Sequence, residues 1–159
     1  MKKNIAVYAG TFDPVTNGHL DIIKRSAAIF DEVFVVVLTN TAKKPMFSAN
    51  ERQSFIQKAT EKIPNVKVLS KEADLTVNVA QTLKAQVIIR SVRNTQDLEF
   101  EQNIAAMNKE LAPKIETLIL LTDPKYAFLS STLVKEVARF KGELGNLVPP
   151  IVQAALSEK

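Results

Sequence analysis

The stretch YAGTFDPVTNGHLDII, residues 8–23, decides the fold that the sequence predicts. Asn4–Ala9, which runs into this stretch, is mostly apolar and is typical of a buried strand. Gly10 ends the apolar run, and Gly18 stands directly before His19, the only histidine of the chain, where an amphipathic helical pattern begins. Such a junction between a strand and a helix is a common phosphate site, because the N-terminus of a helix attracts anions.

The glycines of this junction match neither common phosphate-binding signature. The chain has four glycines in total, and neither GxxxxGK[ST] nor GxGxxG occurs. Side chains and helix N-termini must then bind any phosphate. His19 is expected to begin the first helix, where the positive partial charge disfavours a second ring proton while the ring N–H can still donate. Two simpler roles stay open, in which His19 only starts the helix and Thr11 only caps a turn.

Strand patterns and helix patterns alternate along the sequence. The predicted strands are Asn4–Ala9, Glu32–Leu38, Val66–Leu69, Ala85–Ile89 and Glu116–Leu121. The predicted helices are His19–Phe30, Ala49–Lys62 (opened by a Ser48/Glu51 capping box), Thr76–Lys84, Asp97–Leu111 and Ser131–Phe140, with a sixth after Pro149-Pro150. Apolar strands that alternate with helices predict a parallel sheet covered on both faces. We therefore expect one α/β domain over residues 1–159, with a doubly wound, five-stranded parallel sheet.

The predicted fold brings four polar clusters to one edge of the sheet. Ligands of doubly wound proteins bind beyond the carboxyl ends of the strands. The clusters that follow predicted strands are Gly10–His19, Lys43 with Lys44, Arg90 with Arg93, and Ser130–Thr132. Four of the five strands are thus expected to deliver hydrogen-bond donors or cations to the same rim.

The composition favours a small phosphorylated ligand. The net charge is +4, from 21 Lys and Arg against 17 Asp and Glu, but no basic run exceeds two residues. A basic pocket explains this surplus, and no nucleic-acid partner is expected. Apolar runs such as Val33–Leu38 are too short to span a membrane, and the N-terminal apolar stretch is too short for a secretory signal. The absence of cysteine excludes disulfides and fits a reducing compartment, so a cytoplasmic location is expected.

Two separated motifs resemble those of the nucleotidyltransferase superfamily. Gly10-Thr11-Phe12-Asp13-Pro14, followed by Thr16-Asn17-Gly18-His19, is similar to the T/HxGH signature. Leu129–Glu136, LSSTLVKE, is similar to the ISSTxxR motif, with Leu for Ile and Lys for Arg. Within the superfamily, Lys43-Lys44-Pro45-Met46-Phe47 and the Arg90/Arg93 pair resemble the bacterial phosphopantetheine adenylyltransferases. The resemblance runs from the first strand past residue 150.

This resemblance implies a Rossmann-like nucleotidyltransferase fold and a specific reaction. Members of the family transfer AMP from ATP to 4′-phosphopantetheine, which gives dephospho-coenzyme A and pyrophosphate in coenzyme A biosynthesis. Mg²⁺ accompanies ATP, and because the sequence has no carboxylate cluster, phosphates and water are expected to hold most of the ion. The resemblance also implies a homo-oligomer, a hexamer built as a dimer of trimers, and makes feedback by coenzyme A plausible.

The resemblance implies roles for individual residues. His19 would bind the α-phosphate, Thr11 would hold the attacking phosphate, and Lys43 and Arg93 would neutralise phosphate charge. The implied acceptor-binding residues are Thr11, Lys43, Thr76 and Arg90. The implied ATP-binding residues are Thr11, Phe12, His19, Ser91, Val92, Arg93, Glu101, Tyr126, Ala127, Phe128, Leu129, Ser130, Ser131 and Thr132.

Simpler interpretations of these residues stay open on the sequence alone. Ser130–Thr132 could only cap a helix, and helix periodicity makes Glu101 a solvated residue. Ser91 stands where the family usually has glycine, and a positive φ there would strain a serine. Two rival functions also stay open. One is a sister nucleotidyltransferase with another phosphate acceptor, and the other is a non-catalytic ATP-binding sensor module.

Overall fold

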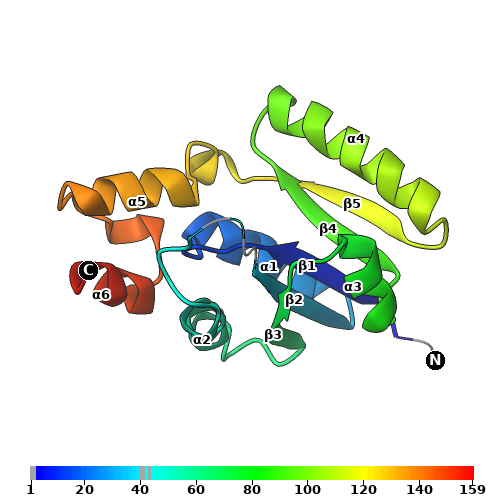
Figure 1. The fold of residues 1–159 in the computed structure, drawn as a ribbon, viewed down its shortest axis with the longest axis horizontal. Helices are drawn as coiled ribbons and strands as arrows, with labels where there is room; N and C mark the ends of the chain where they lie inside the picture. Colours follow the sequence, from blue (N-terminus) through cyan, green and yellow to red (C-terminus); the bar gives the residue numbers. More distant parts are fainter. Residues whose placement is uncertain (1–2, 40–41, 43) are drawn as a thin grey trace.

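Strands and helices alternate along the described chain, residues 3–39, 42 and 44–159 of the computed structural model (Figure 1). The strands are β1 (Ile5–Gly10), β2 (Glu32–Thr39), β3 (Val66–Glu72), β4 (Val87–Val92) and β5 (Glu116–Leu121). The α-helices are α1 (Asn17–Ile29), α2 (Ala49–Ala59), α3 (Thr76–Thr82), α4 (Thr95–Leu111), α5 (Ser131–Arg139) and α6 (Pro150–Ser157). Two short 3₁₀ helices, η1 (Pro124–Tyr126) and η2 (Gly145–Leu147), precede α5 and α6.

The sheet has the order β3-β2-β1-β4-β5, and all its strand pairs are parallel. The chain moves outward from β1 to β3, then returns to place β4 on the other side of β1. The direction of winding therefore reverses between β1 and β4, where the carboxyl ends of the strands border a crevice that can admit ligands. The predicted doubly wound, five-stranded α/β fold is confirmed.

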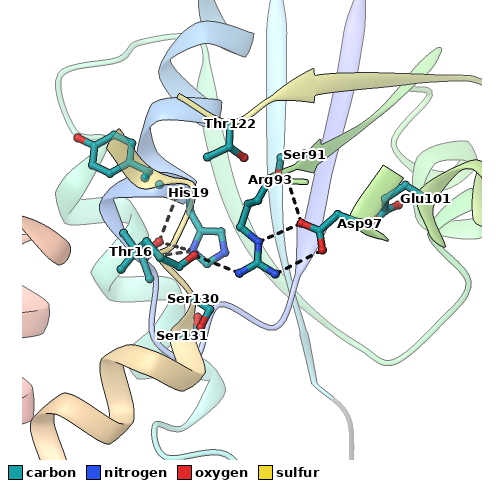
Figure 2. A pocket seen from close by; sticks show the side chains of 12 residues that line it. Thr16, His19, Ser91, Arg93, Asp97, Glu101, Thr122, Ser130 and Ser131 are labelled. Carbon is teal, nitrogen blue, oxygen red and sulfur yellow. Dashed lines mark hydrogen bonds and ion pairs between the residues drawn. The ribbon is translucent and has the colours of Figure 1, made fainter. Parts of the chain in front are cut away.

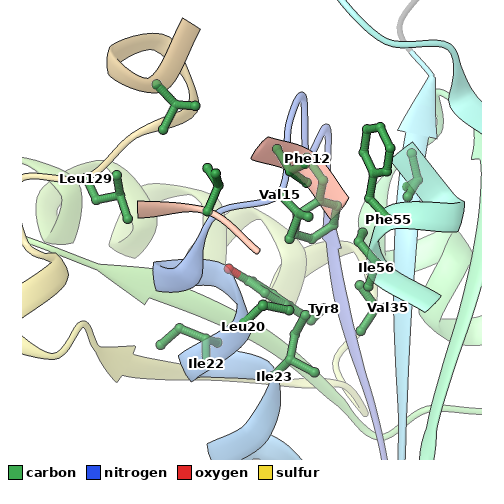
Figure 3. Close-up of a cluster of buried hydrophobic side chains, with 14 of the residues drawn as sticks. Tyr8, Phe12, Val15, Leu20, Ile22, Ile23, Val35, Phe55, Ile56 and Leu129 are labelled. Atoms are coloured by element: carbon green, nitrogen blue, oxygen red, sulfur yellow. The ribbon is translucent and has the colours of Figure 1, made fainter. Parts of the chain in front are cut away.

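Apolar side chains of the central strand alternate between two cores, as the period of a strand requires. Ala6 and Tyr8 pack in a core that α1, α2, α5 and α6 cover, and Figure 3 shows Tyr8 there among Ile23 and Val35. Val7 and Ala9 pack on the opposite face, where α3 covers them. Both faces of the central strand are thus buried, and polar groups gather at the carboxyl edge of the sheet.

The fourth strand was predicted at Ala85–Ile89, but it spans Val87–Val92. Ala85 belongs to the turn after α3, where its backbone amide donates to the carbonyl of Ala80 at 2.9 Å. Arg90 and Ser91 therefore lie within β4 and not in a loop after it. Ser91 pairs with Leu120 of β5, and its φ is not positive, so the expected strain at this serine is absent.

Other boundaries differ where a cap or a ladder extends beyond the apolar pattern. The third strand was predicted to end at Leu69, but it continues to Glu72 because its last residues pair with β2. The Ser48/Glu51 capping box of α2 is present as predicted, but that helix ends at Ala59 and not at Lys62. Helices α3, α4 and α5 differ from prediction by one or two residues at one end. No helix in the described part of the chain is long and apolar enough to cross a membrane.

Helix α1 offers a matched test of the core, because Ile23 is fully buried while Ile29 is 57% exposed. Ile23→Ala should lower the free energy of unfolding by about 2–5 kcal/mol, because it removes buried methyl groups and leaves a cavity. Ile29→Ala should change it by no more than about 0.5 kcal/mol. Urea unfolding followed by circular dichroism measures both. Equal losses in the two variants would contradict the assigned burial.

Candidate active site

The loop between β1 and α1 holds an aromatic ring beneath the imidazole of His19. Phe12 has a φ of +48°, and its side chain is buried in the core on this side of the sheet. Its ring packs edge to face against the rings of Tyr8 and His19. The distances between ring centroids are 5.4 Å to Tyr8 and 5.1 Å to His19. Phe12 therefore supports the imidazole from the core side, and Thr11 beside it is exposed at the rim.

His19 is the third residue of α1 and not its first, because the helix begins at Asn17 with Thr16 as N-cap. The Thr16 hydroxyl oxygen accepts the backbone N–H of His19 at 3.3 Å. In return, Nδ1 of His19 accepts the backbone N–H of Thr16 at 3.0 Å, so the imidazole takes the place that a glutamate has in most capping boxes. Because a backbone N–H can only donate, the proton of the neutral ring is on Nε2.

Burial lowers the pKa of His19 from 6.5 to about 4, and the nearby positive charge of Arg93 lowers it further in the same direction. A lowered pKa means that the ring stays neutral from alkaline pH down to about 4. The ring is therefore a neutral donor at physiological pH. The sequence predicted this state from the helix N-terminus, but burial is the larger cause.

Arg93 is fixed by a carboxylate that the sequence analysis did not select. Asp97, in the first turn of α4, accepts from the Arg93 backbone N–H at 2.9 Å and from Nε at 3.0 Å. These bonds lower the pKa of Asp97. In Figure 2 the guanidinium of Arg93 lies between the His19 ring and Asp97. The spacing of four residues between Arg93 and Asp97 was the available signal for this pair.

Arg90 is paired with Glu101 across β4 and α4. Nε and Nη2 of Arg90 each donate to a different carboxylate oxygen of Glu101 at 2.7 Å. The interaction raises the pKa of Arg90. Glu101 is 7% exposed, so the interpretation of this residue as solvated was wrong. Because Arg90 lies inside the strand, its partly buried charge needs a counter-ion. The periodicity of α4, which carries Glu101, contains no information about a charge on β4.

The N-terminus of α5 is tied to the loop before α1. Ser130 caps α5 by accepting the backbone N–H of Leu133 at 3.1 Å, which agrees with the capping interpretation for this residue. The Ser131 hydroxyl donates to the carbonyl of Pro14 at 2.8 Å. The N-termini of α1 and α5 consequently face one region, and both favour an anion there.

Two cavities meet at His19 and Ser131, which line both. The first, about 280 Å³, also includes the predicted residues Ser91, Arg93, Glu101, Tyr126, Leu129 and Ser130 (Figure 2). The second, about 370 Å³, also includes the predicted residues Thr11, Phe12 and Thr132. The imidazole therefore stands where a group bound in one cavity can meet a group bound in the other.

The structure does not bring every predicted site residue to these cavities. Thr76, Arg90, Val92, Ala127 and Phe128 line neither of them. Lys43, a predicted catalytic residue, lies outside the described residues.

The sequence analysis also missed cavity residues. Asp97 and Thr122 line the first cavity, and Asp13, Arg52 and Lys135 line the second. Lys44 lines the second cavity as well, although the sequence analysis selected Lys43 and not Lys44. Most of these residues come together only through contacts between elements far apart in the sequence.

Comparison with known families identifies the fold and its general chemistry. The family described as Cytidylyltransferase-like matches residues 7–137, most of the chain. The match begins in β1 and ends in α5, so it contains both cavities' shared residues, His19 and Ser131. The chain belongs to the cytidylyltransferase-like family of the nucleotidyltransferase superfamily, and nucleotidyl transfer is the activity of that family.

The single histidine makes its titration directly measurable, since no other imidazole contributes to the spectrum. The proton on Cε1 of His19, followed by NMR, should titrate with a pKa of about 4. Arg93→Gln removes a neighbouring positive charge and should raise this pKa, which should remain below 6.5 because burial is the larger cause. A wild-type pKa at or above 6.5 would contradict the assigned environment.

Proposed function

We propose that this cytidylyltransferase-like protein transfers the adenylyl group of ATP to 4′-phosphopantetheine. An acceptor phosphate oxygen attacks the α-phosphorus, the bond from that phosphorus to the pyrophosphate oxygen breaks, and dephospho-coenzyme A and pyrophosphate leave. The choice of ATP and of this acceptor is supported by the resemblance of Lys43–Phe47 and of the Arg90/Arg93 pair. The observation that carries the proposal is the neutral imidazole of His19, with Nε2–H as its free donor, at the junction of two cavities.

His19 acts in this proposal as a fixed donor to the α-phosphate. Among the described residues, no group accepts a hydrogen bond from its Nε2, and Nδ1 is already occupied by Thr16. Direct displacement at phosphorus depends mainly on positioning and on charge stabilisation. A donor that is already oriented needs no reorganisation when negative charge develops on the phosphoryl oxygens.

The reaction needs no general base from the protein. A phosphate monoester has its second pKa near 6, so the acceptor is already largely a dianion at neutral pH. The pKa of His19, about 4, suits a donor and not a base at that pH. Arg93 and the N-terminus of α5 would offset the negative charge of the two approaching anions.

Arg90 and a metal ion enter the proposal through the resemblance. The resemblance implies that Arg90 contacts the acceptor phosphate, and its side chain, 26% exposed, would have to share its charge with Glu101. The described residues contain no group of three or more His, Cys, Asp or Glu that could hold a metal ion. A Mg²⁺ ion that arrives with ATP would therefore take most of its ligands from phosphates and water.

The choice of substrates is tested by a panel that pairs ATP or CTP with different acceptor phosphates. The acceptors are 4′-phosphopantetheine, nicotinate mononucleotide and glycerol 3-phosphate, and released pyrophosphate is measured. We expect release with ATP and 4′-phosphopantetheine alone. Release with another pair would favour a sister nucleotidyltransferase, and no release with any pair would favour a non-catalytic sensor.

The role of His19 is tested by substitution. His19→Ala should lower kcat by about 10²–10³-fold, because one oriented donor to the transition state is lost. His19→Gln, whose amide N–H can still donate, should retain more activity than the alanine variant. The affinity for ATP, measured by calorimetry, should change little in either. Turnover of the alanine variant within tenfold of wild type would contradict the role.

We also propose that a second copy of the chain covers an exposed apolar stripe on α4, as expected for a homo-oligomer. The stripe consists of exposed apolar side chains at spacings of four, three and four residues, namely Phe100, Ile104, Met107 and Leu111. This spacing is typical of the apolar contact between two paired helices. The stripe carries no charge, so two copies can meet there without like-charge repulsion. It lies on a helix that packs beside β5, an edge strand of the sheet.

The stripe is tested by light scattering after size exclusion. The wild type should have the mass of an oligomer, a hexamer by resemblance, and Met107→Glu should reduce it. Gln102→Glu, at an exposed position of the same helix outside the stripe, should leave the mass unchanged. A monomeric wild type, or equal effects of both substitutions, would contradict this assignment.

A further inference from the structure

Arg52 carries a buried charge that is bound by backbone carbonyls. Arg52 is only 2% exposed, yet no described carboxylate forms an ion pair with its guanidinium. Burying a guanidinium is costly unless its N–H groups are hydrogen-bonded. Nη1 donates to the carbonyl of Thr11 at 2.7 Å, and Nε donates to that of Phe47 at 3.0 Å. A side chain needed only for packing could be apolar, so these contacts indicate a specific task.

The carbonyls bound by Arg52 belong to the parts of the chain that surround the second cavity. Thr11 begins the loop after β1. Leu38, near the end of β2, accepts a further bond from Nη1 at 3.3 Å, and Phe47 precedes α2. Leu38 and Phe47 thus flank the connection between β2 and α2. One guanidinium joins both sides of that connection to the loop that carries Thr11.

Asp13 reinforces this junction from the opposite direction. Its carboxylate accepts the backbone N–H groups of Met46 at 2.8 Å and Phe47 at 3.0 Å. It also accepts from Nζ of Lys135 on α5 at 3.3 Å. The loop after β1 therefore binds the segment before α2 through donors and acceptors at once. Bonds in both directions fix the relative position of the two segments more tightly than either set alone.

The joined segments form the wall of the second cavity. Thr11 lines this cavity, and so do Lys44 and Pro45, which directly precede Met46. Arg52 and Asp13 thus fix the backbone of Thr11 relative to Met46 and Phe47, the residues that follow Lys44 and Pro45. The first cavity does not include either residue.

We propose that Arg52 is a positioning residue for the acceptor, with Asp13 as its partner, and that it acts through Thr11 and Lys44. This inference rests on the proposed function, and it adds that the acceptor phosphate binds in the second cavity, which Thr11 lines. Arg52 touches no reacting atom in this account. Its effect should therefore appear in acceptor binding, while ATP, bound mainly in the first cavity, should be little affected.

The test compares Arg52→Lys with a control on the same helix. Lysine keeps the charge, but all its donors are on one nitrogen, whereas Arg52 bonds to Phe47 through Nε and to Thr11 through Nη1. Arg52→Lys should raise KM for the acceptor at least tenfold, with KM for ATP within twofold of wild type. Thr60→Ala removes a buried hydroxyl that bonds to Ile56 at the far end of α2, so it weakens the helix without touching the cavity. At a matched loss in Tm, it should leave both KM values unchanged.

Asp13→Asn provides an independent second variant, because an amide oxygen can replace only part of the carboxylate's bonds to Met46, Phe47 and Lys135. It should also raise KM for the acceptor more than KM for ATP, including in the case that Arg52→Lys does not fold. Equal changes in both KM values, or the same acceptor effect in Thr60→Ala, would overturn the inference. A wild type inactive with every acceptor would instead refute the proposed function, which the substrate panel detects separately.

Discussion

The hydrogen bond from the backbone amide of Thr16 to Nδ1 of His19 is the contact on which the site depends. It closes the capping box of α1, so the start of a helix and the orientation of the imidazole are set by one interaction. It also selects the tautomer, since an occupied Nδ1 leaves the proton on Nε2. Burial then keeps the ring neutral. The histidine is in this way a donor of fixed direction, which suits the stabilisation of charge on phosphorus.

The arginines around the two cavities differ in the groups that bind them. Arg93 and Arg90 in the region of the first cavity each have a carboxylate partner, Asp97 and Glu101 respectively. These partners hold the guanidinium groups in defined directions, and they also limit the net positive charge. On the side of the second cavity, Arg52 binds carbonyls and shapes the wall. In the proposed reaction, such a site would order two anionic substrates mainly by geometry, with neither a Gly-rich loop nor a protein nucleophile.

The fold could be predicted from the sequence because its determinants are local. The apolar strands, the Ser48/Glu51 capping box and the alternation of strands with helices each depend on residues close in the chain. The fourth strand was misplaced because Arg90 and Ser91 end the apolar run, although both continue the ladder with β5. The partly buried charge of Arg90 is paired with Glu101, a residue on another element. No local pattern contains that information.

The candidate site could be predicted in part for the same reason. His19 and Thr11 could be predicted from the T/HxGH-like stretch, because this stretch contains the whole junction between β1 and α1. Asp97 had a local signal, its spacing of four residues from Arg93. That the pair belongs to the site follows only from the position of Arg93 next to His19 in the folded chain. Arg52 and Asp13 had none, since the bond from Arg52 to Thr11 and the bond from Met46 to Asp13 each join residues more than 30 apart in sequence. Long-range polar contacts of this kind become visible only in the folded chain.

The state of the His19 ring is the central claim, and ¹⁵N NMR of the imidazole tests it most directly. At pH 7 the account predicts a protonated Nε2 and an unprotonated Nδ1 that accepts a hydrogen bond. Addition of ATP should shift the Nε2 resonance strongly and the Nδ1 resonance little. A protonated Nδ1, or an Nε2 resonance that ATP leaves unchanged, would contradict the account.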